Sequence, residues 1–543
     1  AHSLRFGFEY SKYDINHFQP QASNGPRGGF NFTGGLTSLS GGASTTGYNS
    51  WGDFLLGLPQ GMGKDVQYLN PATVRMPSYG LYARDSWQVN RKLTINYGLR
   101  YEFYPPPRRD HWAGERYDPN TDMVYRGGYD VGIGQIAPRL GIAYRLNEKT
   151  VIRAGGGISV DPNSFRYLRD DYPATISTQY SGASSFQAAG TLRTGIPAVV
   201  GPDLKLDQFP LPLAVGTTTF PQVFHRGYVE SWNFTIQRDI GGGFNIQAAY
   251  VGSRGVRQTV NQNINAAGPG GGNNGRALFA KFGRATNITY HTPFDTSVYD
   301  GLQFQATKRV GATMLGVSYT YSKSITWGDD TDSGLTWNWA PMIYRNRAVA
   351  GFDRTQNLQV YGNYELPFGA KHKLASSGIV SKVVGGWQMN WIMSVMSGTP
   401  FTVGSSATSV NAPGNTQTAD QVKGEVAILG GHGVGQAYFD PLAFKAVTDV
   451  RFGNSGRNIL RGPGVFNVDG SVFRNFSMKE RVKLQVRVEM FGVTNTPQFG
   501  NPGATVSNMT LNADGSVRAL GGYTEITSAT GERQIRFAAK ISF

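Results

Sequence analysis

One short stretch of the chain concentrates carboxylates at a spacing that could hold a cation. GDDTDSG (residues 328–334) places Asp329, Asp330 and Asp332 almost side by side. The alternating pair Asp330 and Asp332 resembles the start of a calcium-binding loop, whose oxygen ligands surround the ion. The residues that follow, LTWNWAP, supply no acidic side chain to complete the ligand set. Cation binding and an ordinary solvated loop therefore both stay open for these three residues.

The other reactive residue types are not arranged for bond chemistry. The seven histidines are isolated, without an HExxH pair for zinc, and the chain has no cysteine. No GxSxG nucleophile elbow occurs. The glycine-rich segment GPGGGNNG (268–275) resembles a phosphate cradle but is not placed between a strand and a helix. We therefore expect no catalytic residue, no cofactor and no enzymatic activity.

The charge balance is basic but does not indicate a nucleic-acid partner. The chain carries 51 Lys and Arg against 36 Asp and Glu, a formal net charge of +15. Its basic residues are spread singly, without the dense runs that mark phosphate-binding tails. We therefore expect no nucleic-acid binding.

The composition indicates many strands and turns rather than helices. The chain has 72 Gly, 31 Phe, 27 Tyr and 9 Trp, although only 39% of its residues are hydrophobic. No run approaches the roughly 20 apolar residues of a membrane helix. A membrane β-strand needs only about ten residues with one apolar face, so a membrane location stays possible. The chain opens in a strand-like pattern without a signal peptide, and we expect a processed or truncated product.

Period-two alternation recurs along the whole chain and predicts β-strands. In residues 79–103, YGLYARDSWQVNRKLTINYGLRYEF, two alternating runs flank a turn at 90–92, and Asp85 is an exception on an otherwise apolar face. Similar hairpins are predicted at 138–158, 230–255, 299–324 and 467–492, with further pairings of 354–369 with 385–398 and of 4–10 with 28–34. We expect about fifteen strands of nine to eleven residues.

The predicted strand RVKLQVRVEM (481–490) has one apolar face and one polar face. Its valines, Leu484 and Met490 alternate with Arg481, Lys483, Gln485, Arg487 and Glu489. A soluble sandwich would bury the apolar face under a second sheet. A membrane barrel would instead turn it to lipid and its polar face to a water-filled lumen. We favour the barrel, and the lumen-facing candidates are Arg100, Arg153, Arg481, Lys483 and Arg487.

The predicted connections alternate between short turns and long polar stretches. The long ones cover roughly 160–226, 255–297, 325–352, 400–465 and 495–530. Short turns on one side and long loops on the other are typical of outer-membrane barrels. Five aromatic residues in these loops could stack on a ligand or simply pack the loops: Trp327, Trp337, Trp339, Phe401 and Tyr438.

Several stretches together resemble the C-terminal barrel of TonB-dependent outer-membrane transporters of the Oar-like group. They are SWGDFLLGLP (50–59), YGLYARDSWQVNRKLTINYGLRYE (79–102), APRLGIAY (137–144), YVGSRG (250–255), SYTYSKS (318–324), YELPFG (364–369), GWQMNWIMSVMSGTPFTV (386–403) and VEMFGVTNTPQFGNP (488–502). These stretches occur along the whole chain. The resemblance therefore implies one domain, residues 1–543, which is the C-terminal portion of a TonB-dependent receptor-like barrel, without a plug or N-terminal domains.

The resemblance implies an all-β fold, a large antiparallel transmembrane barrel with long extracellular loops. Family members resemble a 22-stranded barrel, so the resemblance implies that this chain is a C-terminal portion of such a barrel or that it pairs with further strands. A sixteen-stranded barrel that closes on itself is the remaining alternative. The resemblance also implies a Gram-negative outer membrane, the lipid of that membrane, TonB acting through a plug, and uptake of a scarce small-molecule or glycan ligand. The terminal Phe543 resembles the signal read by the barrel-assembly machinery. A passive porin and a secreted soluble binding or adhesion protein are the alternatives.

Overall fold

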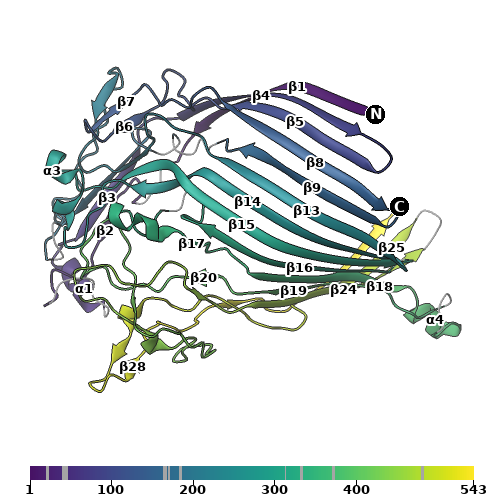
Figure 1. The fold of residues 1–543 in the computed structure, drawn as a ribbon. Coiled ribbons are helices and arrows are strands. Elements are labelled where there is room, and N and C mark those ends of the chain that lie inside the picture. The colour runs from purple at the N-terminus through teal and green to yellow at the C-terminus, as the bar shows by residue number, and fades with distance from the viewer. Residues whose placement is uncertain are drawn as a thin grey trace.

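One large antiparallel sheet dominates the computed structural model (Figure 1). The structure describes residues 1–19, 24–39, 47–162, 168, 171–182, 186–311, 313–330, 334–369, 374–477 and 482–543. Within these residues the sheet has 16 strands. Its continuous path is β1 (His2–His17), β4 (Ala72–Gln88), β5 (Leu93–Phe103), β8 (Gln135–Asn147), β9 (Thr150–Val160), β13 (Tyr228–Gly241), β14 (Phe244–Asn263), β15 (Ile288–Val310), β16 (Thr313–Thr326), β18 (Gln356–Glu365), β19 (Trp387–Met396), β24 (Val465–Ser477), β25 (Lys483–Phe491) and β30 (Gln534–Ser542). The short strands β12 (Thr217–Thr219) and β17 (Ala348–Val349) join β15 and β16.

The predicted strand pairings are confirmed except for the pairing of 4–10 with 28–34. β1 does not pair with 28–34. It pairs with β4 along its whole length, whereas β2 (Gly29–Asn31) pairs with β3 (Gly61–Gln67). Sixteen paired residues satisfy the backbone of a long strand, and a three-residue partner cannot do so. The predicted pairing of 4–10 with 28–34 was therefore wrong. It relied on closeness in the sequence, whereas matching strand length decides the partner of β1.

The strands reach further than their alternation predicts. Their lengths run from nine residues in β25 to 23 in β15. The predicted loop 255–297 is therefore strand at both of its ends, because β14 and β15 continue pairing past an irregularity near Gly255 and Gln258, and the connection itself is 264–287. The longest strands, β14 and β15, exceed the span of a bilayer and carry the sheet beyond it.

The apolar face of the sheet is exposed instead of being buried. Phe6 on β1 is 84% exposed and Phe537 on β30 is 81% exposed. Large apolar side chains are exposed on the strands between them as well, for example Leu81, Leu99, Leu140, Phe234, Phe304 and Met389. Within the described residues no second sheet packs on this face. A soluble sandwich would bury it, so the expected large membrane-type sheet is the fold observed.

The long connections gather at one end of the sheet and the short turns at the other (Figure 1). We name the described residues of the long connections, within 18–71, 104–134, 161–227, 264–287, 327–355, 397–464 and 492–533, the loop crown. It contains β6 (Arg116–Asp118), β7 (Met123–Tyr125), β10 (Thr175–Ser181), β11 (Gln208–Pro210), β20 (Pro400–Phe401), β21 (Asp420–Gln421), β22 (Phe444–Lys445), β23 (Leu460–Arg461), β26 (Gln498–Phe499), β27 (Thr510–Leu511), β28 (Val517–Ala519) and β29 (Ala529–Thr530), besides β2, β3, β12 and β17.

The helices are few and short. In the crown they are α1 (Tyr48–Leu55), α3 (Phe279–Phe282) and the 3₁₀ turns η1 (Asn273–Gly275), η2 (Ala340–Asn346), η3 (Pro441–Ala443) and η4 (Val506–Asn508). The remaining helix, α4 (Gly378–Val384), lies outside the crown. It is in the connection between β18 and β19, at the end of the sheet with the short turns. Among the described residues, none of the helices has the length and apolar character to cross a membrane.

The buried hydrophobic cores lie in the crown and not within the sheet. The first core joins the β19–β24 and β25–β30 connections around Phe439, Phe444 and Tyr523. Another joins three connections and the start of β15, and includes Tyr117 and Phe209. Loops with cores of their own hold one arrangement, in contrast to solvated linkers.

The face assignment predicts opposite effects of arginine at neighbouring positions of β15. Phe304 lies on the exposed apolar face near the middle of the stretch that pairs with both β14 and β16. Phe304→Arg should cost about 2–4 kcal/mol of folding free energy in lipid vesicles, because it places a charge in hydrocarbon. The measurement is reversible folding of the protein into liposomes, followed by tryptophan fluorescence.

Gln305→Arg is the matched control, since Gln305 lies on the polar face opposite Gln247 and Ser318. It should change the folding free energy by less than about 0.5 kcal/mol. Equal costs at the two positions would contradict the assignment of the faces.

Candidate functional site

The polar face of the sheet holds ion pairs along its first strands. Arg100 on β5 lies opposite Tyr82 of β4 and Ala137 of β8. Its guanidinium donates hydrogen bonds to Glu102 at 2.7 Å and to Glu9 at 2.9 Å. This charge is therefore compensated within the wall itself. That the wall lines a lumen stays a prediction.

The other predicted wall residues lie on the same face at separate places. Arg153 on β9 donates to the Gln237 side chain of β13 at 2.6 Å. Arg487 on β25 pairs with Glu489 at 2.9 Å and stacks over the Phe473 ring. Lys483 begins β25 on the same side as Arg487. Arg481 lies outside the described residues, so the structure brings these candidates into one wall but not into one cluster.

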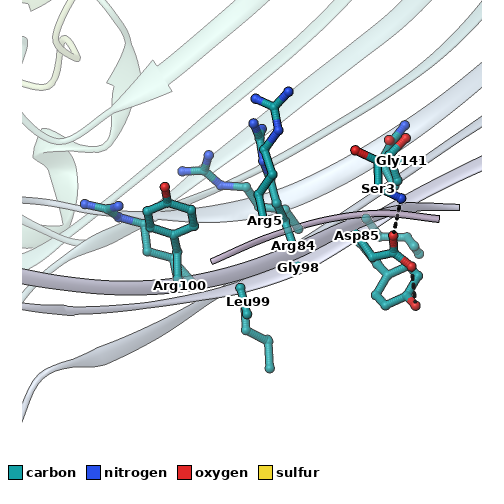
Figure 2. A pocket seen from close by; sticks show the side chains of 16 residues that line it. Ser3, Arg5, Arg84, Asp85, Gly98, Leu99, Arg100 and Gly141 are labelled. Atoms are coloured by element: carbon teal, nitrogen blue, oxygen red, sulfur yellow. Dashed lines mark hydrogen bonds between the residues drawn. The ribbon is translucent and has the colours of Figure 1, made fainter. Parts of the chain in front are cut away.

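The sequence analysis missed a second set of arginines on this face. Arg5 on β1 lies directly opposite Arg84 on β4, and Arg84 lies opposite Gly98 on β5, which in turn faces Arg139 on β8. Figure 2 shows the Arg5, Arg84 and Arg100 side chains on one side of the sheet and Leu99 on the other. These residues line a concavity of about 740 Å³.

A sequence signal for this set existed. Each arginine stands between outward-facing residues of an alternating run, in LRFGF, YARDS and PRLGI, and all of these neighbours are apolar except Asp85. Alternation therefore gives their face. It does not give their common row, because the row depends on the register between strands that are distant in sequence.

Asp85, the exception on the apolar face, is accommodated by neighbours on that face. It is only 4% exposed, although it lies among outward-facing side chains. Its carboxylate lies 2.6 Å from His2 Nδ1 and accepts hydrogen bonds from the Tyr97 hydroxyl at 3.0 Å and from the Ser3 amide at 3.1 Å. A buried carboxylate is tolerated where its oxygens are paired in this way.

The crown is fixed by buried arginines as well as by its hydrophobic cores. Arg284 is fully buried and forms a bidentate pair with Asp122, at 2.6 and 3.0 Å. It also donates to the carbonyl oxygens of Leu211, Pro212 and Val215. One guanidinium thus joins three connections that are distant in sequence.

A second ion pair lies within the β19–β24 connection of the crown. Arg451 donates to both carboxylate oxygens of Asp420, at 2.9 and 2.5 Å. Hydrogen bonding to Arg451 lowers the pKa of the Asp420 carboxyl below its ordinary value. The pair holds the strand pairing of β21 and β22 beside the hydrophobic core that contains Phe444.

The acidic stretch 328–334 is only partly described. Asp329 accepts a hydrogen bond from the Gly351 amide at 2.8 Å and pairs with Arg457 at 3.2 Å, so it serves a contact between loops. Asp330 also makes an interaction, and Asp332 lies outside the described residues. Among the residues that the structure places, no group of three His, Cys, Asp or Glu could hold a metal. Cation binding at the full triad stays a prediction.

The loop aromatics pack the crown. Trp337 is fully buried, and Phe401 and Tyr438 are each 8% exposed within hydrophobic cores. Trp327 contacts Phe294 edge-on, and Trp339 lies against Phe452. The loop-packing alternative therefore describes these five residues better than ligand stacking does.

The last residue is placed as its alternation predicts. Phe543 follows β30 and is 99% exposed, in phase with Phe537 and Ile541 on the apolar face. Its role as an assembly signal stays a prediction.

A sheet of long strands with an exposed apolar face, a charged opposite face and one crown of loops defines an integral membrane β-sheet protein. Comparison with protein families agrees: residues 1–536 match the family described as outer membrane beta barrel domain, and the chain belongs to that family. The protein is therefore placed in the outer membrane of a Gram-negative envelope. No curated protein matched the chain.

Solved structures of outer-membrane transporters and receptors are similar to this chain at low sequence identity. The outer membrane transporter YddB from Escherichia coli has 10% identity and a TM-score of 0.46, covering 89% of this chain and 49% of that one. The siderophore receptor PirA from Acinetobacter baumannii has 9% identity and a TM-score of 0.46, covering 100% and 52%. The FrpB iron transporter from Neisseria meningitidis has 11% identity and a TM-score of 0.44, covering 100% and 52%. The chain spans about half the length of these proteins.

Removing the buried guanidinium should loosen the crown without unfolding the sheet. Arg284→Gln leaves Asp122 and several carbonyl oxygens without their donor, so we expect a local loss of about 3–5 kcal/mol. Hydrogen exchange of the amides in β7 and β11 measures this loss. Arg193→Gln, an exposed crown position, is the control and should change exchange by less than about 0.5 kcal/mol. Equal protection in both variants would show that the ion pair does not hold the crown.

His291 makes crown stability depend on pH. It directly follows the part of β15 that pairs with β12, is fully buried beside Phe220, and its Nδ1 is 3.0 Å from the Asn261 side chain. Burial lowers the pKa of His291 to about 3. An unfolded histidine binds a proton below about pH 6.5 whereas the folded one does not, so stability is complete above that pH and is lost as the pH falls.

We expect hydrogen-exchange protection of β12 to fall by roughly 1.4 kcal/mol per pH unit between about pH 6 and pH 4. His291→Gln should flatten this dependence. His225→Gln, at an exposed position of the crown, should leave the dependence unchanged. An unaltered slope in His291→Gln would assign the effect to another group.

Proposed function

We propose that this chain is the barrel portion of a TonB-dependent, Oar-like receptor that takes up a scarce ligand, such as a siderophore or an oligosaccharide. The observation that carries the proposal is the packed crown, since loops with buried cores present a preformed surface. A preformed surface loses less conformational entropy on binding than mobile loops do. The stretches from 50–59 to 488–502 that resemble this group support the same proposal.

In this proposal each part of the sheet has one task. The crown faces the cell exterior and captures the ligand, and the short turns and α4 face the periplasm. The polar face with Arg100, Arg153, Lys483 and Arg487 lines the passage. Phe543 is presented to the barrel-assembly machinery, and energy from TonB acts through a plug segment. These steps bind and move a solute and need no bond chemistry.

The sheet edges favour a barrel with more strands than the sixteen described. Among the described pairings, β1 and β30 are each joined on one side only. An unpaired backbone N–H or C=O in hydrocarbon costs several kcal/mol, so both edges need partners. We therefore propose that further strands lie between β30 and β1, as in a 22-stranded barrel. A porin formed by this chain alone would instead need these two edges to pair with each other, which would close a ring of the fourteen strands on the continuous path, since β12 and β17 lie off it.

Single cysteines test the orientation cleanly, because the chain has none of its own. Asn512→Cys in the crown should react with a membrane-impermeant maleimide in intact cells. Val380→Cys on α4, an exposed position, should react only after the outer membrane is permeabilised. The opposite pattern would reverse the proposed orientation.

Active and passive passage give different uptake. A receptor of this type should support growth on a limiting siderophore or glycan only in cells with a functional TonB, and should conduct no steady ion current in planar bilayers. A steady current together with TonB-independent uptake would identify a passive channel instead.

A further inference from the structure

Three arginines on the polar face have no partner within the described part of the chain. Arg5, Arg84 and Arg139 are all exposed, and no ion pair or hydrogen bond of their guanidinium groups is found there. Arg100, one row further along β5, differs because Glu102 and Glu9 compensate it. The three form a separate, uncompensated positive row.

The register brings this row together at an electrostatic cost. Arg5 and Arg84 are directly opposite on neighbouring strands, where like charges destabilise a sheet. Strands are spaced about 4.8 Å apart, so the row from β1 to β8 extends across about 14 Å. An anion bound over the row would remove the repulsion, and guanidinium groups are well suited to carboxylate and phosphate oxygens.

Glycines beside the row leave room for the long side chains. A Cβ at Gly98 would lie 2.8 Å from Cβ of Arg84, and one at Gly157 would lie 2.9 Å from Cγ of Arg139. The row borders the concavity of about 740 Å³, and Figure 2 shows the Arg5 and Arg84 side chains rising from one side of the sheet. The hollow is large enough for a small organic anion.

We propose that Arg5, Arg84 and Arg139 form a binding site for a multivalent anion that carries several carboxylate or phosphate groups. The proposal rests on the proposed function only in placing this face towards the passage. The anion is either a free solute or the acidic side chains of a polypeptide segment seated against the wall. Both sources offer the same oxygens to the row.

The test titrates the detergent-solubilised full chain with citrate, pyrophosphate and a hexaglutamate peptide by isothermal calorimetry. We expect binding that weakens with salt, and at least a tenfold rise in Kd in the double variant Arg84→Gln/Arg139→Gln. The matched control Arg309→Gln/Lys540→Gln removes two charges from the same face on β15 and β30, and its Kd should stay within twofold. Heat-modifiable migration on gels verifies that each variant is folded.

The outcomes separate the sources of the anion. Binding of citrate or pyrophosphate supports a free solute, whereas binding of hexaglutamate alone supports an acidic segment. Absence of binding by all three probes, or equal weakening in the control, overturns the proposal. A second readout is the unfolding temperature, which citrate or the peptide should raise in the wild type and not in Arg84→Gln/Arg139→Gln. Failure here leaves the maleimide and uptake results untouched, so it is distinguishable from failure of the proposed function.

Discussion

Backbone hydrogen bonding in hydrocarbon is the constraint on which this structure depends. Lipid offers no partner for an N–H or C=O group, so each strand in the membrane must pair along its length on both sides. This explains why β1 passes over the nearby β2 and pairs with the distant β4. It is also the reason for our proposal that further strands pair with the two edges of the sheet.

The same constraint moves hydrophobic packing to an unusual place. The apolar face of the sheet is satisfied by lipid, so it needs no second protein layer. Ordinary burial is left to the crown, where Tyr523, Phe209 and Trp337 are each buried almost completely. Arg284 adds an ion pair between connections that are far apart in sequence, and Asp420 adds one within the β19–β24 connection. The crown can hold one shape because it has cores of its own.

The polar face combines compensated and uncompensated charge. Arg100, Arg153 and Arg487 each have a partner within the sheet. Arg5 and Arg84 face each other instead, and an arrangement that costs stability in the empty wall is readily understood if an anion occupies it. The distinction matters because net charge alone would treat all of these residues as equivalent.

The sequence by itself determined the strands and their faces, because period-two alternation depends only on neighbouring residues. It gave the hairpin of 467–492, the side on which Arg100 lies and the outward position of Phe543. Only the tertiary structure decided the partner of β1, the extension of β14 and β15 into the two ends of 255–297, and the row of Arg5, Arg84 and Arg139. These features depend on register and length matching between segments that are distant in the chain, and local alternation contains no information about either.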